Sequence, residues 1–423
     1  MTGLSRAAIL AVGSEMLTPS KVDTNSLFIT EQLNLLGIEV VFKAVVGDDR
    51  DELGRLLSLA TDRVDLVVCS GGLGPTDDDV TREVVADTLG LPLSEDLEIT
   101  ERIRQRFATR GMQMPEINRR QAMVPADGLV LENANGSAPG LWLEHRRGVV
   151  ILLPGPPREL QPMMRALVDG RLRERGAGLS LVRRVIRITG RSESHTEEAV
   201  RGFYPQWAAA AIPISATILA SLGQIELHLS ARAADRAAAD EALAAAVDQV
   251  VAAIGADIYD TNGRPLEAVV GALLADRGQH IAVAESCTGG LIASRLTDVA
   301  GSSRYFDEGV VVYSNAAKTS LLGVPAPLIA EHGAVSEPVA LAMARGMLER
   351  AGADVAIGVT GIAGPGGGTV EKPVGTVAIA VVTKTETRSR VFRFIGGREM
   401  VKFQSSQGAL DMVRRLYAPV HRD

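Results

Sequence analysis

Short apolar runs alternate with amphipathic stretches over the first 170 residues of the chain. Residues 7–12, 38–46 and 64–69 are apolar runs of strand length. Segments 24–36 and 51–61, which lie between these runs, have the apolar spacing of helices. This alternation predicts a parallel sheet with helices on both faces, in which ligands bind beyond the carboxyl ends of the strands.

The pattern changes between residues 171 and 256. Two strand-like segments, 184–189 and 225–230, alternate with helical segments at 193–200 and 233–254, which predicts a small α+β domain with a KH-like texture. No G-x-x-G clamp is present, so we expect packing or dimerisation rather than RNA binding. The uncharged stretch 202–225 contains two prolines and is interpreted as soluble core and loop, not as a membrane span.

The α/β pattern returns at residues 257–423. Strands are expected at 280–284, 309–313 and 355–359, helices at 266–275, 290–299 and 338–351, a closing hairpin at 374–382 and 388–394, and a final helix that ends at residue 417. The predicted fold class is therefore α/β. Two α/β/α sandwich domains, residues 1–170 and 257–423, are separated by the small α+β domain, residues 171–256.

Composition narrows the classes of function. The chain has 44 Lys and Arg against 51 Asp and Glu, a net charge of −7, and only 4% aromatic residues. A nucleic-acid partner is not expected, because such proteins usually present a basic face or stacking aromatics. The two cysteines, Cys69 and Cys287, exclude a disulfide framework, and without a predicted export signal or membrane span we expect a cytoplasmic protein.

The most specific candidate chemistry lies in the segment AESCTGG, residues 284–290, at a predicted strand-to-helix turn. There Ser286 is placed as a nucleophile, and the amides of residues 288–290 are possible oxyanion donors. Lys318 is placed as its base: with Asn315 expected to cap the following helix, Lys318 falls in the first turn, where the positive end of the helix dipole favours the neutral amine. Tyr313 is expected to assist the pair. The alternatives remain a helix-capping Ser286, a core Tyr313 and a solvated Lys318; Cys287 is a rival nucleophile without a nearby histidine motif.

A glycine-rich loop follows a later predicted strand, at residues 361–368. Close approach of the backbone to a phosphate or ribose would explain this composition, and a flexible loop would explain it equally well. The loop matches neither the Walker pattern nor G-x-G-x-x-G, so it indicates no nucleotide class.

Acidic residues gather at the predicted strand ends of the first domain: Glu15, Asp23, Asp77, Asp78, Asp79 and Glu159. Hard divalent cations prefer oxygen ligands, and a phosphate-bearing substrate would need such a cation. Alternatively, residues 77–79 only begin a helix, where acids are favourable. The six histidines lack ligand spacing, so no zinc site is expected.

Taken together, the motifs resemble the competence/damage-inducible CinA family in its long bacterial form. The first-domain segments that carry the resemblance are 13–15, 23–25, 71–81, 133–140 and 153–159. This domain is similar to molybdopterin-binding proteins, and in the family it is associated with metal-dependent cleavage of ADP-ribose to AMP and ribose 5-phosphate. The last domain resembles the PncC-type amidase, which converts nicotinamide mononucleotide to nicotinate mononucleotide and ammonia.

The resemblance implies roles for individual residues. The catalytic residues would be Ser286, Lys318 and Tyr313. The substrate contacts would be Thr288, Gly289, Asn315, Thr360, Gly361, Gly364 and Arg398 in the last domain and Gly71, Gly72, Gly74 and Thr76 in the first. The ligands of a divalent metal (Mg, Mn or Co) would be Glu15, Asp23, Asp78, Asp79 and Glu159.

No cofactor is expected for the amidase, and the expected partners are small-molecule nucleotides and a second copy of the chain in a homodimer. Two alternatives stay open. In the first alternative, the first domain is a non-catalytic pterin- or nucleotide-binding module. In the second, the whole protein is an interaction factor in DNA uptake or repair.

Overall fold

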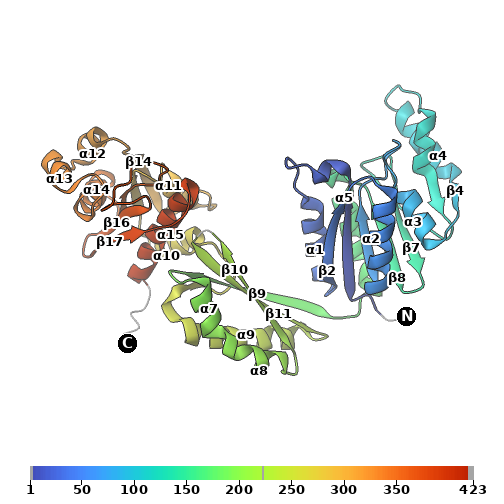
Figure 1. Cartoon of the computed structure of the whole chain (residues 1–423), viewed down its shortest axis with the longest axis horizontal. Coiled ribbons are helices and arrows are strands. Elements are labelled where there is room, and N and C mark those ends of the chain that lie inside the picture. Colours follow the sequence, from blue (N-terminus) through green and yellow to red (C-terminus); the bar gives the residue numbers. More distant parts are fainter. Residues whose placement is uncertain (1–2, 222, 418–423) are drawn as a thin grey trace. The chain divides into compact units, whose positions relative to one another are not determined.

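The computed structural model describes residues 3–221 and 223–417, and Figure 1 follows the chain through them. Its contacts divide the chain into two compact units. One comprises the residues up to Val182 together with Arg232–Asp240, and the other comprises Arg183–Ala231 and the residues from Glu241 onward.

A six-stranded sheet forms the centre of the first unit, with strand order β2-β1-β3-β8-β7-β6. The strands are β1 (Arg6–Val12), β2 (Glu39–Val46), β3 (Leu66–Ser70), β6 (Leu129–Leu131), β7 (Gly140–His145) and β8 (Gly148–Leu153). The first four in the sheet order run parallel, as predicted, whereas β7 and β6 are antiparallel. The expectation of an all-parallel sheet is wrong at this edge, because two residues join β7 to β8 and so short a connection permits only a hairpin.

Helices cover both faces of this sheet (Figure 1). Helices α1 (Thr24–Leu35) and α5 (Pro157–Asp169) pack on one face, and α2 (Arg50–Arg63) and α3 (Thr81–Leu89) on the other. Since side chains alternate along a strand, Ile9 of β1 joins the core under α1 while Leu10 joins the core under α2. Outside the sheet lie β4 (Leu93–Glu95), α4 (Leu97–Ala108), β5 (Met123–Pro125) and α6 (Arg171–Arg175).

A second sheet has the order β10-β11-β9-β12 and contains the middle segment of the chain. Its strands are β9 (Ser180–Thr189), β10 (Ile214–Ser221), β11 (Gln224–Ala233) and β12 (Ile258–Asp260), and its helices are α7 (Glu193–Val200), α8 (Tyr204–Ala208) and α9 (Arg236–Ile254). Strand β10, which pairs antiparallel with β11, lies in the uncharged stretch interpreted above as core and loop. That interpretation missed the strand, because most of the side chains of β10 beyond Ile214 are exposed or half-buried and no buried apolar run marks it.

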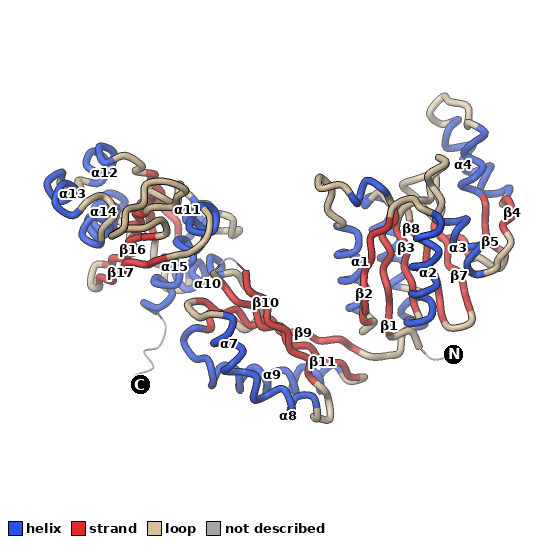
Figure 2. Tube along the Cα trace, in the orientation of Figure 1, coloured by secondary structure: helices blue, strands red, loops and turns tan. Residues whose placement is uncertain are grey.

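The third sheet has the order β14-β13-β15-β16-β17 (red in Figure 2). Its strands are β13 (Ile281–Glu285), β14 (Phe306–Val311), β15 (Val355–Gly361), β16 (Thr376–Thr383) and β17 (Thr387–Arg393). The first three strands of the order run parallel, and β16 and β17 form the predicted hairpin. Helices α10 (Leu266–Ala275), α11 (Leu291–Thr297) and α15 (Arg398–Tyr417) cover one face, and α12 (Asn315–Leu322), α13 (Ala326–His332) and α14 (Glu337–Ala351) cover the other.

Strand order places an opening at the carboxyl edge of each sandwich. In the third sheet β13 lies between β14 and β15, so the connections that leave these strands diverge to opposite sides. In the first sheet β1 lies between β2 and β3 in the same way. Open α/β sheets bind ligands at such switch points. The protein thus has the predicted fold class, two α/β/α sandwiches with a small α+β segment between them, and within the described residues no helix is both long and apolar enough to span a bilayer.

Candidate functional site

Ser286 and Lys318 meet at the switch point of the third sheet. Ser286 directly follows β13, and its backbone N–H donates to the carbonyl of Val359 in the neighbouring β15 at 3.0 Å. Lys318 lies in α12, which begins where the chain leaves β14. Its Nζ lies 3.2 Å from Ser286 Oγ. Both residues are buried, with 1% of Lys318 and 7% of Ser286 exposed, so the hydroxyl and the amine are both shielded from solvent.

Two carbonyl groups orient the amine of Lys318. Its Nζ donates to the carbonyl oxygens of Val312 at 3.0 Å and Tyr313 at 3.3 Å. No carboxylate forms an ion pair with it in the described part of the chain. Burial lowers the pKa of Lys318, because desolvation penalises the ammonium form. A neutral amine has two N–H groups and one lone pair; the two carbonyls engage the N–H groups and leave the lone pair for the hydroxyl proton of Ser286.

Helix α12 begins differently from the sequence-based expectation, although Lys318 still lies in its first turn. The side chain of Ser314 caps the helix by accepting from the N–H of Ala317 at 3.1 Å, and Asn315 is the first helical residue with an exposed side chain. Asn315 is therefore not the cap. A serine hydroxyl reaches the orphan N–H groups of a helix start as readily as an asparagine amide.

The turn after Ser286 is held by a buried carboxylate. Glu285 is fully buried and accepts from the N–H groups of Gly290, Ile292 and Ala293 at 2.9–3.1 Å, which neutralises the start of α11. The N–H of Gly289 donates to the carbonyl of Ser286 at 3.2 Å. The amides of residues 289 and 290, which we expected to be oxyanion donors, are therefore already engaged.

Three polar groups in the same turn are left for a ligand. Within the described residues the N–H groups of Cys287 and Thr288 donate to no backbone acceptor. Thr288 Oγ1 is fully buried and has no hydrogen-bond partner. A buried polar atom without a partner is unfavourable, so a bound ligand that supplies an acceptor or donor would remove a cost.

Cys287, the rival nucleophile, lies in the wrong environment for that role. Its side chain is 5% exposed, and burial raises the pKa of its thiol to about 12. The thiolate is the nucleophilic form, so this cysteine is inert at neutral pH. Its sulfur packs against β15, where a Cβ added to Gly361 would come within 2.9 Å of it. Gly361 is thus required for close packing beside Ser286.

Tyr313 and Arg398 lie together at an exposed edge of the site. The Tyr313 side chain is 63% exposed, and its hydroxyl accepts from Arg398 Nη2 at 3.4 Å. Arg398 Nη1 donates to the carbonyl of Gly364 in the glycine-rich loop at 2.9 Å. The structure therefore brings the Tyr313 carbonyl, but not its hydroxyl, into contact with Lys318. Thr360 is buried, and its hydroxyl donates to the carbonyl of Ala334 at 2.8 Å, so this side chain secures the end of β15.

Lys402 is a cation that the sequence analysis missed. It lies one turn after Arg398 in α15, and its Nζ would be 3.6 Å from a Cβ added to Gly289, which places the ammonium beside the Ser286 turn. Lys402 has no hydrogen-bond or ion-pair partner within the described residues. The spacing of Arg398 and Lys402 was the available signal, since residues four apart share one face of a helix.

A second group of candidate residues lies at the switch point of the first sheet. Gly71 and Gly72 both have positive φ, and a Cβ on Gly71 would lie 2.1 Å from the carbonyl oxygen of Val12 in β1. The loop is closed by Thr81, whose hydroxyl donates to the Gly71 carbonyl at 2.9 Å. The loop at Gly71 therefore packs directly against the end of β1, where it forms part of the wall of a cavity of about 340 Å³.

The carboxylates of this site differ in the cavity that they line and in the protein groups that they already bind. Four of the five predicted metal ligands line the 340 Å³ cavity: Glu15, Asp78, Asp79 and Glu159. The predicted substrate contacts Gly71, Gly72 and Gly74 line it too. Asp23 instead lines a neighbouring cavity and caps α1 by accepting from the N–H of Ser26. Asp79 accepts from the N–H of Gly74 at 2.8 Å and from Thr76, so its carboxylate secures the loop, and Thr76 does not line the cavity. Asp48, which also lines it, was not among the predicted residues.

These carboxylates fit a cation that is bound jointly with a substrate. No three of the described acidic, histidine or cysteine side chains converge on one metal position. Mg²⁺ does not require such a cage, because it is commonly held by one or two carboxylates, water and substrate phosphates. The Glu15 carboxylate has no hydrogen-bond partner within the described residues, and Glu159 uses Oε2 to accept from Asn133 at 2.6 Å. Glu15, Asp78 and the remaining oxygen of Glu159 are the groups that fit this role.

Three family models match successive parts of the chain. A probable molybdopterin binding domain matches residues 8–174, the KH domain of damage-inducible protein CinA matches residues 183–259, and the CinA C-terminal domain matches residues 263–417. A crystal structure of competence/damage inducible protein from Agrobacterium tumefaciens is 42% identical and covers 36% of this chain and 94% of its own, with a TM-score of 0.36.

Curated relatives match over almost their whole length. A CinA-like protein of Koribacter versatilis is 46% identical over 417 residues, which are 97% of this chain and 99% of the relative. A CinA-like protein of Acidobacterium capsulatum is 45% identical over 418 residues, with the same coverage. These matches and the order of the three domain models agree with the motifs described above, and the chain belongs to the CinA family.

Proposed function

We propose that the third sheet and its helices form an amidase that hydrolyses the carboxamide of nicotinamide mononucleotide to nicotinate mononucleotide and ammonia. One observation carries this proposal: the Ser286 hydroxyl lies 3.2 Å from a buried lysine amine whose two other hydrogen-bond partners are carbonyl groups. A serine becomes nucleophilic when a neighbouring base removes its proton, and a desolvated neutral lysine is such a base.

In the proposed reaction, Lys318 takes the proton of Ser286 Oγ while the oxygen attacks the carboxamide carbon. The amides of Cys287 and Thr288 stabilise the negative charge that develops on the carbonyl oxygen, since neither has a backbone acceptor. The ammonium of Lys318 returns its proton to the departing nitrogen, and the C–N bond breaks to release ammonia. Water then attacks the ester with Lys318 again as base, which releases the acid and restores Ser286.

Arg398 and Lys402 provide the charge for the phosphate of a mononucleotide. Both lie in the first turns of α15, and both are close to groups that border Ser286: Arg398 to Tyr313 and Lys402 to Gly289. The Lys402 ammonium has no protein acceptor among the described residues, so a phosphate would be its first ion-pair partner. These two cations favour an amide substrate that carries a negatively charged phosphate over an uncharged amide substrate.

We expect amidase activity to fall as the pH is lowered through the pKa of Lys318. The protonated amine has no lone pair for the Ser286 proton, so only the deprotonated enzyme reacts. Because burial lowers this pKa from 10.5, the acidic limb of kcat/KM should lie clearly below pH 10.5. A pH–rate profile of the full chain measures it. A limb at the ordinary lysine value, or a rate that rises toward acid, would contradict the assigned base.

For the first unit, we propose metal-assisted cleavage of ADP-ribose to AMP and ribose 5-phosphate. The support is the single cavity in which the loop at Gly71 and Gly72 faces Glu15, Asp78 and Glu159. A bound divalent cation would offset the charge of the diphosphate there. The chain's own residues hold the loop in place, through Asp79 on Gly74 and Thr81 on Gly71, and so position the diphosphate between the loop and the carboxylates.

We expect Asp78→Asn to lower ADP-ribose cleavage about 100-fold, since one of the carboxylates that would hold the divalent cation is lost. Asp77→Asn is the matched control, because the Asp77 carboxylate is fully exposed and does not line the cavity. Chelator should abolish AMP release and leave ammonia release from nicotinamide mononucleotide unchanged. Unchanged AMP release in chelator would exclude the metal, and tight nucleotide binding without turnover would identify a binding module.

A further inference from the structure

The 340 Å³ cavity at the end of β1 is rich in acceptors and poor in donors. Five carboxylates line it: Glu15, Asp48, Asp78, Asp79 and Glu159. Among the described residues that line this cavity there is no lysine, arginine or histidine, and Gln121 supplies the only side-chain N–H group. A diphosphate that leaves water needs donors as well as a cation, because a phosphoryl oxygen without a hydrogen bond is costly. The donors present are backbone N–H groups, the Ser137 hydroxyl and the Gln121 amide.

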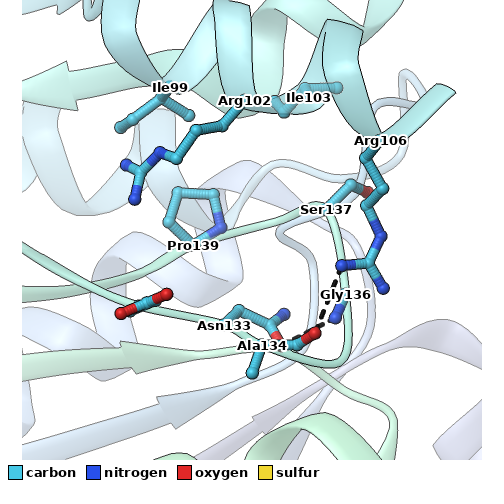
Figure 3. Close-up of a pocket in the computed structure, with 10 residues that line it drawn as sticks. Ile99, Arg102, Ile103, Arg106, Asn133, Ala134, Gly136, Ser137 and Pro139 are labelled. Carbon is cyan, nitrogen blue, oxygen red and sulfur yellow. Dashed lines mark hydrogen bonds between the residues drawn. The ribbon is translucent and has the colours of Figure 1, made fainter. Parts of the chain in front are cut away.

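The arginines of α4 belong to a different cavity. That cavity, of about 210 Å³, adjoins the first at Ser137 and lies between α4 and the loop at residues 132–139 (Figure 3). Figure 3 shows Arg102 and Arg106 on the α4 side, and neither of them lines the 340 Å³ cavity. Arg106 Nη1 also donates to the carbonyl of Ala134 at 3.3 Å. The space among the five carboxylates is thus left without a cationic side chain of its own.

The Gln121 amide is buried and has a fixed orientation. Gln121 lies in a short 3₁₀ helix, η2 (Glu116–Ala122), and is 3% exposed. Its Oε1 accepts from Asn118 Nδ2 at 3.0 Å, and Asn118 is itself buried. Because Asn118 engages the oxygen, the NH₂ group is the end of the amide that is left over. Within the described residues Gln121 Nε2 has no acceptor, so the cavity contains a buried donor that a ligand can use.

A buried arginine holds η2 against the glycine loop. Arg82, in α3, is 1% exposed and donates through Nη2 to the Leu73 carbonyl at 3.1 Å and through Nη1 to the Arg120 carbonyl at 2.9 Å. Leu73 belongs to the loop and Arg120 directly precedes Gln121, so one guanidinium joins two walls of the cavity. Arg120 Nη1 in turn donates to the Thr76 carbonyl at 2.9 Å. These two arginines therefore fix the position of the Gln121 amide relative to the loop.

We propose that Gln121 binds a phosphoryl oxygen of the diphosphate through Nε2, as a substrate-binding residue of the first-unit site. This inference rests on the proposed pyrophosphatase function for the class of substrate. A neutral amide suits a cavity with five carboxylates, because a lysine or arginine there would pair with them and compete with the divalent cation for the same oxygens. The amide donates to the diphosphate and leaves the carboxylates to the cation.

Equilibrium binding to the full chain, in the presence of magnesium, tests the assignment without requiring turnover. ADP and inorganic pyrophosphate are titrated by calorimetry into the wild type, Gln121→Met, Gln121→Glu and the control Gln113→Met. We expect Gln121→Met to weaken both ligands about ten-fold, because the donor is lost. Gln121→Glu should weaken both about 100-fold, because it also places a negative oxygen beside the phosphoryl oxygen. Gln113 is exposed and does not line the cavity, so its variant should match the wild type.

The order of the two Gln121 variants separates ligand binding from a structural role. Glutamate keeps the oxygen that accepts from Asn118, whereas methionine loses it. If Gln121 served only to hold η2 in place, the glutamate variant would bind both ligands like the wild type and the methionine variant alone would be impaired. That order would overturn the proposal, whereas the glutamate variant as the weaker binder supports it. A thermal unfolding scan verifies that both variants fold.

The two ligands locate the contact on the diphosphate. Equal fold-losses for ADP and pyrophosphate are expected, since both present the same phosphoryl oxygens. Weaker ADP binding with unchanged pyrophosphate binding would place Gln121 on the nucleoside and overturn the assignment, as would unchanged affinity for both ligands. Failure of the pyrophosphatase proposal has a different signature, which is the absence of AMP among the products when the wild type is incubated with ADP-ribose, whatever the two affinities are.

Discussion

Replacement of Ser286 by alanine should lower ammonia release from nicotinamide mononucleotide by at least about 1,000-fold. The variant removes the only atom that would form a bond to the substrate carbon, while the turn keeps its shape because alanine differs by one buried oxygen. Substrate affinity should be nearly unchanged, since Arg398 and Lys402 remain. A coupled ammonia assay together with calorimetric titration of the mononucleotide measures both quantities.

Ser294→Ala is the matched control for this variant. Ser294 lies eight residues further along, in α11, and its side chain is exposed, so the same chemical change is made outside the site. It should retain the wild-type rate. If Ser286→Ala also retained that rate, the serine would be a structural residue and the proposed acyl-enzyme would be wrong. A trapped covalent adduct on Ser286, detected by mass spectrometry, would support the mechanism directly.

Replacement of Lys318 by methionine or by arginine should lower kcat by about 100- to 10,000-fold, the range that a positioned general base contributes. The two variants separate two explanations. Methionine retains the length of the side chain without the amine, whereas arginine retains the positive charge but cannot lose its proton. If Lys318 is the general base, both variants should be inactive. A purely electrostatic role for Lys318 predicts that the arginine variant keeps activity.

Lys384→Met provides the control, because Lys384 is an exposed lysine that pairs with Asp354 at 2.9 Å. Circular dichroism and thermal unfolding show whether the Lys318 variants fold. Some loss of stability is expected, about 1–3 kcal/mol, because the carbonyls of Val312 and Tyr313 would lose their buried donor. Full activity in a folded Lys318→Met variant would rule out the lysine as base.

The two proposed sites share one structural principle. Each lies where a central parallel strand, β13 or β1, ends between two neighbours, and each is closed by a loop from the next strand along the sheet. In the third sheet the turn that follows β13 is held by hydrogen bonds to the chain on both sides: the carbonyl of Glu285 accepts from Val312 at 2.8 Å, and the N–H of Ser286 donates to the carbonyl of Val359. The strand order therefore creates the opening, and the residues after the strands determine its chemistry.

Periodicity alone was sufficient to locate most of the elements. The helix expected at 266–275 is α10 (Leu266–Ala275), and the strand expected at 355–359 lies within β15 (Val355–Gly361). These segments are buried and have a single strong pattern, so local hydrophobicity and final structure agree. Strand β10 and the three-residue edge strand β6 were not predicted, because most of their side chains are exposed or half-buried and pairing with neighbours, not burial, makes them strands.

The sequence alone determined which residues carry reactive groups and which strand ends they follow, because residue type and spacing are local properties. Only the tertiary structure decided how these groups are used. The fold brought Lys318 to Ser286 across 32 residues of sequence, and it engaged the amides of Gly289 and Gly290 in hydrogen bonds within the turn. The Asp79 carboxylate accepts from the N–H of Gly74 and so secures that loop. Lys402 was placed beside Gly289. Hydrogen-bond partners and desolvation depend on what packs against a side chain, and that neighbourhood is built from segments distant in sequence.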